Sequence, residues 1–545
     1  MRKQLSGHSA KSVPVLIVGG SLVGLSTSVF LGRLGIDHML VERHPRTSTH
    51  PRGRGNNVRT MEVFRTAGLE TRIREAAWTL AGNDGVLQVD TLTGGQRRWI
   101  VQDISAGMDI SRISSSDWCL CSQNDLEPVL LDAARRQGGD IRFGTEMLSF
   151  EQREDGVRAE VMCRDTGETY SVDAAFLVAA DGPRSSVRER LGIGQSGLGE
   201  LFHNVSITFR SKALKEYVGD KKFVVCYVTD PMGEGALLPV DNEERWVIHT
   251  PWNPDSGEVL EDFGNARVEA HIRAAAGVPD IDVEITGKTP WHASDRVADS
   301  YGKGRVFLAG DSAHEMPPTG AFGSNTGIQD AHNLAWKLAA VLRGWAGTPL
   351  LGTYEQERRP VAVATSARAA LQAVEEQHPG YSPAAHRNND PADLMTVSLC
   401  YRYASDAVVG AAPDRPVVPD GFTLGGEPGT RSPHLWVLRD AVRISTLDLY
   451  ERSFVVLAGS GGRVWRDAAL KAAESLGVPV DAYLVGRGRD LVPEREGDWA
   501  QAHGVTEDGA VLVRPDGFVA WRARAAAPDA DRLLADALRT ALCRS

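Results

Sequence analysis

The feature that most constrains the fold of this chain is a glycine-rich turn between two short apolar runs near its start. Residues 13–18 (VPVLIV) are apolar enough for a buried strand, and a segment with helical spacing, SLVGLSTSVFLGRLG, follows the glycines at once. A second apolar run at 38–41 ends in Glu42-Arg43. Strand, turn, helix and strand within about 30 residues form a βαβ unit. The sequence therefore predicts a parallel sheet with a dinucleotide site at this turn.

The turn itself reads Gly19-Gly20-Ser21-Leu22-Val23-Gly24. It keeps the first and third glycines of the pattern G-x-G-x-x-G, and Ser21 replaces the second, whose small size lets the backbone approach a pyrophosphate. The start of the helix offers unpaired N–H groups to phosphate. Glu42 is placed to accept hydrogen bonds from the hydroxyls of a ribose. A glycine-rich turn of structural use alone is the alternative, but the agreement of strand, helix and acid favours dinucleotide binding.

Length and charge limit the kind of protein this chain can be. A chain of 545 residues is too long for one hydrophobic core, so two or three domains are expected. A net charge of −11 argues against a nucleic-acid binder and gives no support to an anionic membrane as partner. The chain shows neither a secretory signal nor an apolar run near the roughly 20 residues that cross a bilayer. We expect a cytoplasmic monomer or homodimer that binds a small molecule.

The six cysteines are typical of reduced thiols, because none forms a C-x-x-C pair. Cys119 and Cys121 could form a redox pair, but alternate residues of a strand point the same way, so two packed thiols explain the spacing better. Metal-ligand spacing of histidine, cysteine and acidic residues is also lacking. We therefore expect no metal.

The character of the chain changes twice. Between about 196 and 290, FVVCYV, GALLPV and RWVIHT are short β-type runs bounded by turn residues, which predicts a separate antiparallel sheet. Residues 84–117 look irregular. From 433 the order strand, helix, strand, hairpin and helix resembles a thioredoxin fold. The region LAGSGGRVW, where a working thioredoxin carries C-x-x-C, has no cysteine, so the tail is expected to be redox-inactive.

Two further motifs follow the dinucleotide turn. In FLVAADGPRSSVRERLGI an apolar strand ends in Asp181-Gly182. In GRVFLAGDSAHEMPPTGAFGSNTG a strand at 306–309 ends in Gly310-Asp311, and a loop leads to a helix near Gly327. With these three motifs in this order, the chain resembles the class A flavoprotein monooxygenases of the para-hydroxybenzoate hydroxylase type. Within that group it is most similar to the aromatic polyketide hydroxylases, such as the aklavinone hydroxylases, and the similarity extends over nearly the whole chain.

The resemblance implies an α/β fold: a Rossmann-like FAD-binding domain with an inserted, mainly β substrate domain and a C-terminal thioredoxin-like domain. The expected boundaries are 1–83, 118–195 and 290–375 for FAD binding, 84–117 and 196–289 for the substrate, 376–432 for a connecting region, and 433–545 for the tail. The implied cofactor is FAD. NADPH or NADH would bind only transiently as a co-substrate, since no second G-x-G-x-x-G unit is present. Molecular oxygen would be the other co-substrate.

The resemblance also implies site residues. Asp311 would bind the FAD ribitol, Asp181-Gly182 the pyrophosphate and NADPH, and backbone N–H groups after Gly323 the flavin edge that becomes negative on reduction. The full set expected to bind the cofactor is Gly19, Gly20, Ser21, Leu22, Val23, Gly24, Glu42, Arg43, Arg52, Gln123, Leu148, Asp181, Gly182, Asp311, Pro318, Gly320, Gly323, Ser324 and Asn325. The candidates for substrate contact are Tyr227, His249, Pro317 and Phe322.

No catalytic residue can be assigned from the sequence. His314 is tempting as a base, although its position in the motif favours a structural role, and Arg188 lies on an arginine-rich stretch typical of a solvated face. The implied activity is hydroxylation of a polycyclic, polyketide-type phenol through a C4a-hydroperoxyflavin. Baeyer–Villiger or other oxidative tailoring on the same single-FAD fold, and a non-catalytic flavin-fold binding protein, remain open alternatives.

Overall fold

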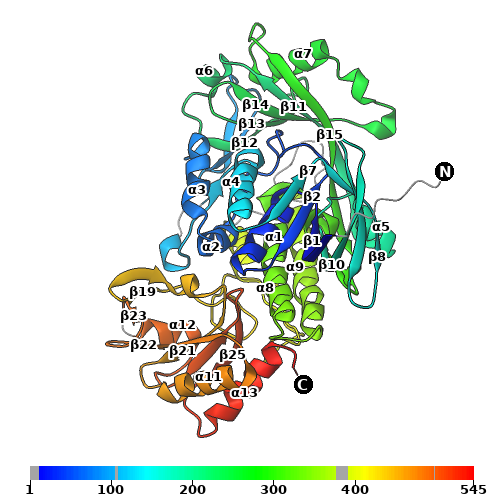
Figure 1. Cartoon of the computed structure of the whole chain (residues 1–545). Coiled ribbons are helices and arrows are strands. Elements are labelled where there is room, and N and C mark those ends of the chain that lie inside the picture. Colours follow the sequence, from blue (N-terminus) through cyan, green and yellow to red (C-terminus); the bar gives the residue numbers. More distant parts are fainter. Residues whose placement is uncertain (1–10, 105–108, 376–390, 496, 545) are drawn as a thin grey trace, which may run out of the picture.

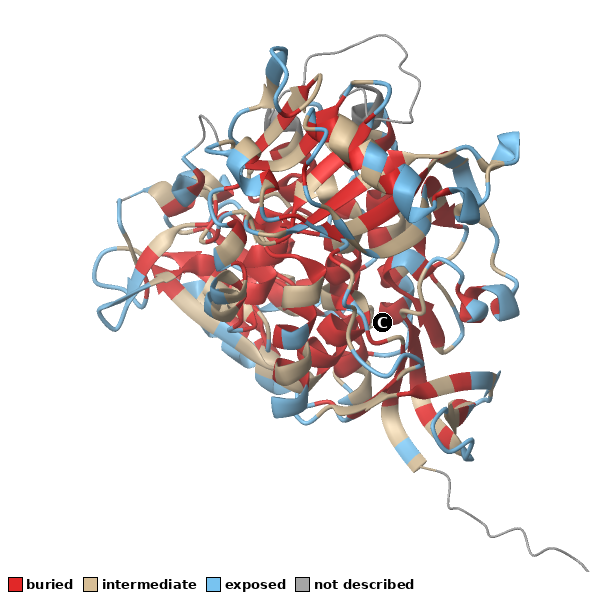
Figure 2. Ribbon diagram, turned by 90° about the horizontal axis from the view of Figure 1, so that it is seen from above, coloured by how far each residue is buried: buried red, intermediate tan, exposed pale blue. Residues whose placement is uncertain are grey.

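The computed structural model describes residues 11–104, 109–375, 391–495 and 497–544. One sheet with its helices occupies the middle of the molecule in Figure 1, a second large sheet lies above it, and the C-terminal tail lies below. Figure 2 shows buried residues through the centre of the molecule, with exposed residues mainly around the rim. The predicted fold class is confirmed, while the domain boundaries stay a prediction.

The middle sheet contains the predicted βαβ unit. Its elements are β1 (Lys11–Val18), α1 (Leu22–Arg33), β2 (His38–Glu42), β7 (Asp140–Phe143), β8 (Thr145–Gln152), β9 (Val157–Cys163), β10 (Thr169–Ala179), β16 (Gly302–Lys303) and β17 (Val306–Leu308). The strand order is β16-β17-β10-β1-β2-β7. Because β17, β10, β1 and β2 pair in parallel, their carboxyl ends share one edge. Open α/β sheets bind their ligands at this edge.

Helices and short strands surround this sheet. They are β3 (Gly55–Asn56), α2 (Val58–Thr66), α3 (Glu70–Ala76), β6 (Cys119–Leu120), α4 (Gln123–Arg136), α5 (Ser186–Leu191), α8 (Phe322–Leu342) and α9 (Pro349–Glu375). The aliphatic side chains of α1 and α8 belong to the same buried cluster as those of β1 and β10. Packing of these helices on the sheet therefore fixes the segments that leave its carboxyl edge.

The upper sheet has the strand order β18-β15-β11-β14-β13-β12-β4-β5. Its strands are β4 (Gly85–Val89), β5 (Arg97–Val101), β11 (Gln195–Arg210), β12 (Phe223–Val228), β13 (Gly235–Pro239), β14 (Arg245–Pro251), β15 (Glu284–Ala298) and β18 (His314–Glu315). The expected antiparallel pairing of the three runs is confirmed. The reading of 84–117 as irregular is wrong, because β4 and β5 extend this sheet. The strand β15 also runs across the boundary expected at 289/290.

The two faces of the upper sheet differ in what covers them. Ile207 pairs with Ile248, which pairs with Leu237, and all three are buried in one cluster with Ile272 of α7 (Asn265–Ala276). In Figure 1, α7 and α6 (Leu214–Val218) lie on the side of this sheet away from the middle sheet. Since side chains alternate along a strand, the residues next to Ile207, Ile248 and Leu237 point to the opposite face of the sheet, toward the middle sheet.

The tail contains the predicted elements in the predicted order, together with an unpredicted hairpin before them and an unpredicted short strand and helix before the final hairpin. It contains β19 (Trp436–Arg439), β20 (Val442–Ser445), β21 (Phe454–Gly459), α11 (Arg463–Leu476), β22 (Val480–Val485), β23 (Val492–Pro493), α12 (Asp498–His503), β24 (Ala510–Val513), β25 (Val519–Ala523) and α13 (Ala530–Ala541). Its central strands follow the order β22-β21-β24-β25. Within the described ranges, no helix is both long and apolar enough to cross a membrane.

The expected connecting region, 376–432, is only partly visible, because residues 376–390 lie outside the described ranges. It continues with α10 (Pro391–Leu399). The chain then runs to the tail, where Gly429 donates from its backbone N–H to Val519 O at 2.7 Å and Arg431 pairs with Phe518. This segment is therefore attached to the tail sheet.

Candidate cofactor and substrate site

The predicted dinucleotide turn lies where β1 meets β10. Gly19 has a φ of 106°, and a Cβ there would lie 2.1 Å from the carbonyl oxygen of Ala180, so only glycine fits. The Glu42 carboxylate accepts the backbone N–H of Gly20 at 2.7 Å and that of His44 at 2.8 Å. A carboxylate has about four acceptor positions. His44 Nδ1 lies 2.5 Å from the same carboxylate. Glu42 is therefore held at the turn by three contacts and keeps about one acceptor position for a ribose hydroxyl.

A partly buried polar cluster between the turn and α4 supports the same turn. Ser21 donates from Oγ to Glu127 at 2.5 Å, and the Gln123 amide donates to Ser21 Oγ at 2.9 Å and to Glu127 at 2.7 Å. Glu127 also accepts the backbone N–H of Ser48 at 2.7 Å. Glu127 is not among the predicted site residues. Its spacing from Gln123 indicates it, because residues four apart on a helix lie on one face.

The second and third motifs are linked to each other by Arg188. Its guanidinium donates to the carbonyl oxygens of Ser312 at 3.0 Å and Pro183 at 2.9 Å. Reading Arg188 as part of a solvated face is wrong, because the side chain is buried. Asp181 accepts Ser185 Oγ at 2.6 Å and so holds the start of α5.

Asp311 combines an exposed side chain with a carboxyl pKa that is shifted by the surrounding protein. Its side chain is exposed. Burial nevertheless raises its pKa, against the opposing positive charges of His314 and Arg52. Surrounding protein can remove solvation without covering a side chain, which reconciles these two observations. Arg52 is itself exposed, so the two charges lie near each other at an open surface.

His314 is not available as a base. It is fully buried, and its Nε2 lies 2.7 Å from Asp330 Oδ2. Asp330 also accepts the backbone N–H of Gly310 at 3.2 Å. The pair therefore holds the turn on both sides of Asp311, in agreement with the structural role favoured for this motif position.

The loop after Asp311 ends at the N-terminus of α8. Gly320 and Ala321 both adopt positive φ, 74° and 53°, and Ala321 makes no side-chain cap. The first N–H groups of an uncapped helix lack partners within it, and they suit a ligand edge that carries negative charge. Gly323 and Ser324 stand in this first turn.

Asn325 and Phe322 have other partners. The Asn325 amide accepts Asn57 N–H at 2.9 Å and donates to the carbonyl oxygens of Gly55 and Ala321 at 2.7 and 2.6 Å. Phe322 is buried in an apolar cluster with Ala369. Both side chains therefore shape the loop.

The remaining predicted residues differ in exposure. Arg43, Leu148 and Pro318 are exposed, whereas Pro317 is buried. The carbonyl oxygen of Leu148 accepts a hydrogen bond from Arg190 of α5, which places Leu148 beside the Asp181 motif.

Tyr227 and His249 lie on the face of the upper sheet that is turned toward the middle sheet. Tyr227 pairs with Ala236, Ala236 with His249, and His249 with Ser206. Ser206 Oγ lies 3.1 Å from Nε2 of His50, two residues before Arg52. The structure therefore brings both substrate candidates onto one face and connects that face to the segment carrying Arg52.

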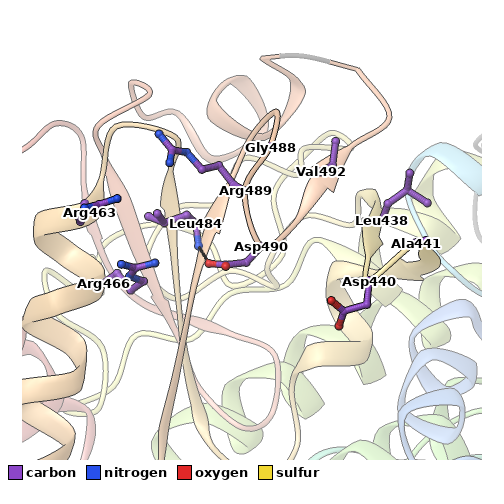
Figure 3. Close-up of a pocket in the computed structure, with 10 residues that line it drawn as sticks. All are labelled: Leu438, Asp440, Ala441, Arg463, Arg466, Leu484, Gly488, Arg489, Asp490 and Val492. Carbon is purple, nitrogen blue, oxygen red and sulfur yellow. Dashed lines mark hydrogen bonds between the residues drawn. The ribbon is translucent and has the colours of Figure 1, made fainter.

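Other features of the chain lie apart from this site. Burial raises the pKa of Cys119 to about 11, which disfavours a reactive thiolate, and Cys121 is buried beside it. A cavity of about 550 Å³ lies in the tail (Figure 3), lined by Arg463 and Arg466 of α11 and by Arg489. Its lining includes neither a cysteine nor a predicted site residue. Its size alone does not make it the candidate site.

The glycine-rich turn, Glu42 and two further Gly/Asp turns gather at the carboxyl edge of one sheet beside an uncapped helix, the place where open α/β sheets bind a nucleotide cofactor. Comparisons with known proteins identify the family. Residues 12–369 match the FAD binding domain family, and residues 426–545 match the C-terminal domain of aromatic-ring hydroxylases. The chain belongs to the FAD-dependent aromatic-ring hydroxylases.

Individual relatives are similar along their full length. A putative polyketide hydroxylase of Streptomyces halstedii is 61% identical, covering 97% of this chain and 96% of that protein. The 4-methyl-5-nitrocatechol 5-monooxygenase of a Burkholderia species is 41% identical, covering 98% of each. The crystal structure of an aklavinone-11 hydroxylase with FAD and aklavinone superposes with a TM-score of 0.88 at 36% identity, covering 98% of this chain and 99% of that one.

Proposed function

We propose that this protein hydroxylates a polycyclic phenol of polyketide type, using FAD, NADPH or NADH, and molecular oxygen. The observation that supports the proposal is the row that Tyr227, His249 and Ser206 form on one face of the upper sheet. Ser206 contacts His50, which connects the row to the segment that carries Arg52, near Asp311. An aromatic substrate between this face and the flavin would be shielded from water. The names of the polyketide and aklavinone relatives agree with this substrate class.

The cofactor would be held by residues from the three motifs. The backbone of the turn Gly19–Gly24 and the start of α1 suit the pyrophosphate, Glu42 the adenosine ribose, and Asp311 the ribitol. The first N–H groups of α8 suit the flavin edge where negative charge collects on reduction. Reduced FAD supplies the oxygen-activating chemistry, and the protein binds, orients and shields the reactants.

His249 is better suited to donate a hydrogen bond than to take a proton. Trp291 donates from Nε1 to His249 Nδ1 at 3.2 Å, so in the neutral ring the proton resides on Nε2. A donor at this position would stabilise charge developing on a substrate oxygen. His249→Gln, which retains a donor, should keep more activity than His249→Ala.

The test is turnover of a panel of phenols of increasing ring number. We expect tri- and tetracyclic phenols to stimulate NADPH oxidation strongly and to gain one oxygen atom by mass. Simple benzoates and catechols should stimulate it hardly at all. If a nitrocatechol or chlorophenol proved the best substrate and polycyclic phenols were inert, the substrate class would be wrong while the hydroxylase family would stand.

A further inference from the structure

The tail reaches into the core of the molecule through the hairpin between β24 and β25. Arg514 donates to both carboxylate oxygens of Glu357 on α9, at 2.5 and 2.8 Å. Asp516 accepts the Asn333 amide of α8 at 3.1 Å. Arg514 and Glu357 have no exposed side-chain surface. The tail therefore contacts both long helices of the FAD-binding core through a buried ionic network.

The next residue of α9, Arg358, continues this network. It donates to Asp330 Oδ1 at 2.7 Å and to the carbonyl oxygen of Thr326 at 3.1 Å. A third donor of the same guanidinium reaches the Tyr403 hydroxyl at 3.2 Å. Tyr403 stacks on Phe518 of the tail hairpin, with ring centroids 4.1 Å apart. The hairpin thus constrains Arg358 through the backbone of α9 and through Tyr403.

The partners of Arg358 support two segments of the candidate cofactor site, the Asp311 turn and the start of α8. Asp330 accepts the Gly310 N–H and pairs with His314, and these two residues flank Asp311. Thr326 follows directly on the first turn of α8, whose N–H groups suit the flavin edge. A shift of Arg358 would therefore move the Asp311 turn and the start of α8 together.

We propose that the hairpin from Arg514 to Phe518 is a positioning element of the FAD site, acting through Glu357 and Arg358 on the Asp311 turn and on α8. This inference rests on the site assignment under the proposed function. The tail then contributes to cofactor affinity without touching the cofactor, and this role is independent of any thiol redox chemistry.

The burial of these charges explains why the contact transmits a displacement. Ions in a low-dielectric interior are tolerated only while each keeps its partners, so the network has few acceptable arrangements. If Arg514 is altered, Glu357 retains Lys337, Asn333 and Ser405 but loses the two parallel bonds that fix the plane of its carboxylate. The expected consequence is a small shift of the α9 segment that carries Arg358, not its release.

The test is the FAD affinity of the apoprotein in Arg514→Lys, which keeps the charge but loses the planar fork of donors. We expect the Kd for FAD to rise about ten-fold, equivalent to about 1.4 kcal/mol. The visible absorption bands of the bound flavin should also change. The matched control is Glu451→Gln, which removes a tail-to-core ion pair with Arg33 of α1 at 2.7 Å. In this control only the Tm should fall, and the Kd should stay within about two-fold.

The outcomes distinguish the proposed role of the tail hairpin from the assignment of the cofactor site itself. If Arg514→Lys and Glu451→Gln both lower Tm and leave FAD affinity and spectrum alone, the tail is only a stabilising domain and this inference is overturned. If Asp311→Ala also leaves FAD affinity unchanged, the site assignment itself is wrong. Should Arg514→Lys fail to fold, the isosteric Asp516→Asn provides the same comparison.

Discussion

Replacing Gly24 by alanine tests the geometry of the dinucleotide turn most directly. A Cβ at Gly24 would lie 1.9 Å from the carbonyl oxygen of Gly19, whereas ordinary contact needs at least 3.4 Å. The separation must therefore grow by 3.4 − 1.9 = 1.5 Å, and both partners are backbone. Overpacking of this kind typically costs about 1–3 kcal/mol. The displacement falls on the start of α1, where we propose that the pyrophosphate binds, so we expect the Kd for FAD to rise at least about ten-fold.

The assay is a titration of apoprotein with FAD, followed by flavin fluorescence, together with the Tm of each variant. Gly352→Ala is the matched control, because Gly352 lies exposed in α9 with nothing within 4 Å of an added Cβ. That substitution should raise stability by about 0.4–1 kcal/mol and leave FAD affinity unchanged. Gly24→Ala with unaltered Tm and FAD affinity would refute the close approach on which the argument rests.

Three further predictions follow from the site and the tail. Asp311→Ala should weaken FAD binding by roughly ten- to a hundred-fold, since a lost charge-assisted hydrogen bond is worth about 1.5–3 kcal/mol; a native-like Kd would count against its role. The tail should not reduce insulin disulfides, and activity clearly above background would contradict this. Burial lowers the pKa of His503 to about 4. Because the unfolded histidine binds its proton near pH 6.5, stability should fall as pH falls from about 6.5 to 4, by up to about 3 kcal/mol. His503→Gln should reduce that loss in Tm measurements, and an identical pH profile would exclude the assignment.

The sequence was sufficient where structure is local. The βαβ unit, the order of elements in the tail and the position of each turn at a strand end follow from residue spacing, because periodicity and glycine placement are properties of adjacent residues. The same spacing indicated Gly19–Gly24 and Glu42 together, and the resemblance to the family added the Asp311 motif. It failed at β4 and β5, which are short and contain polar residues. These two strands pair with each other, but only the pairing of β4 with the distant β12 attaches them to the sheet.

What only the tertiary structure decided is which distant groups meet. The face on which Tyr227 and His249 lie depends on the register of β12, β13 and β14, which no single strand specifies. Arg188 has the composition of a solvated stretch, yet it bridges two motifs in the interior. Arg514 and Glu357 are 157 residues apart, and their pairing connects the tail to the FAD-binding core. Burial and partner choice depend on the packing of whole elements, whereas spacing along the chain reports only what neighbouring residues can form.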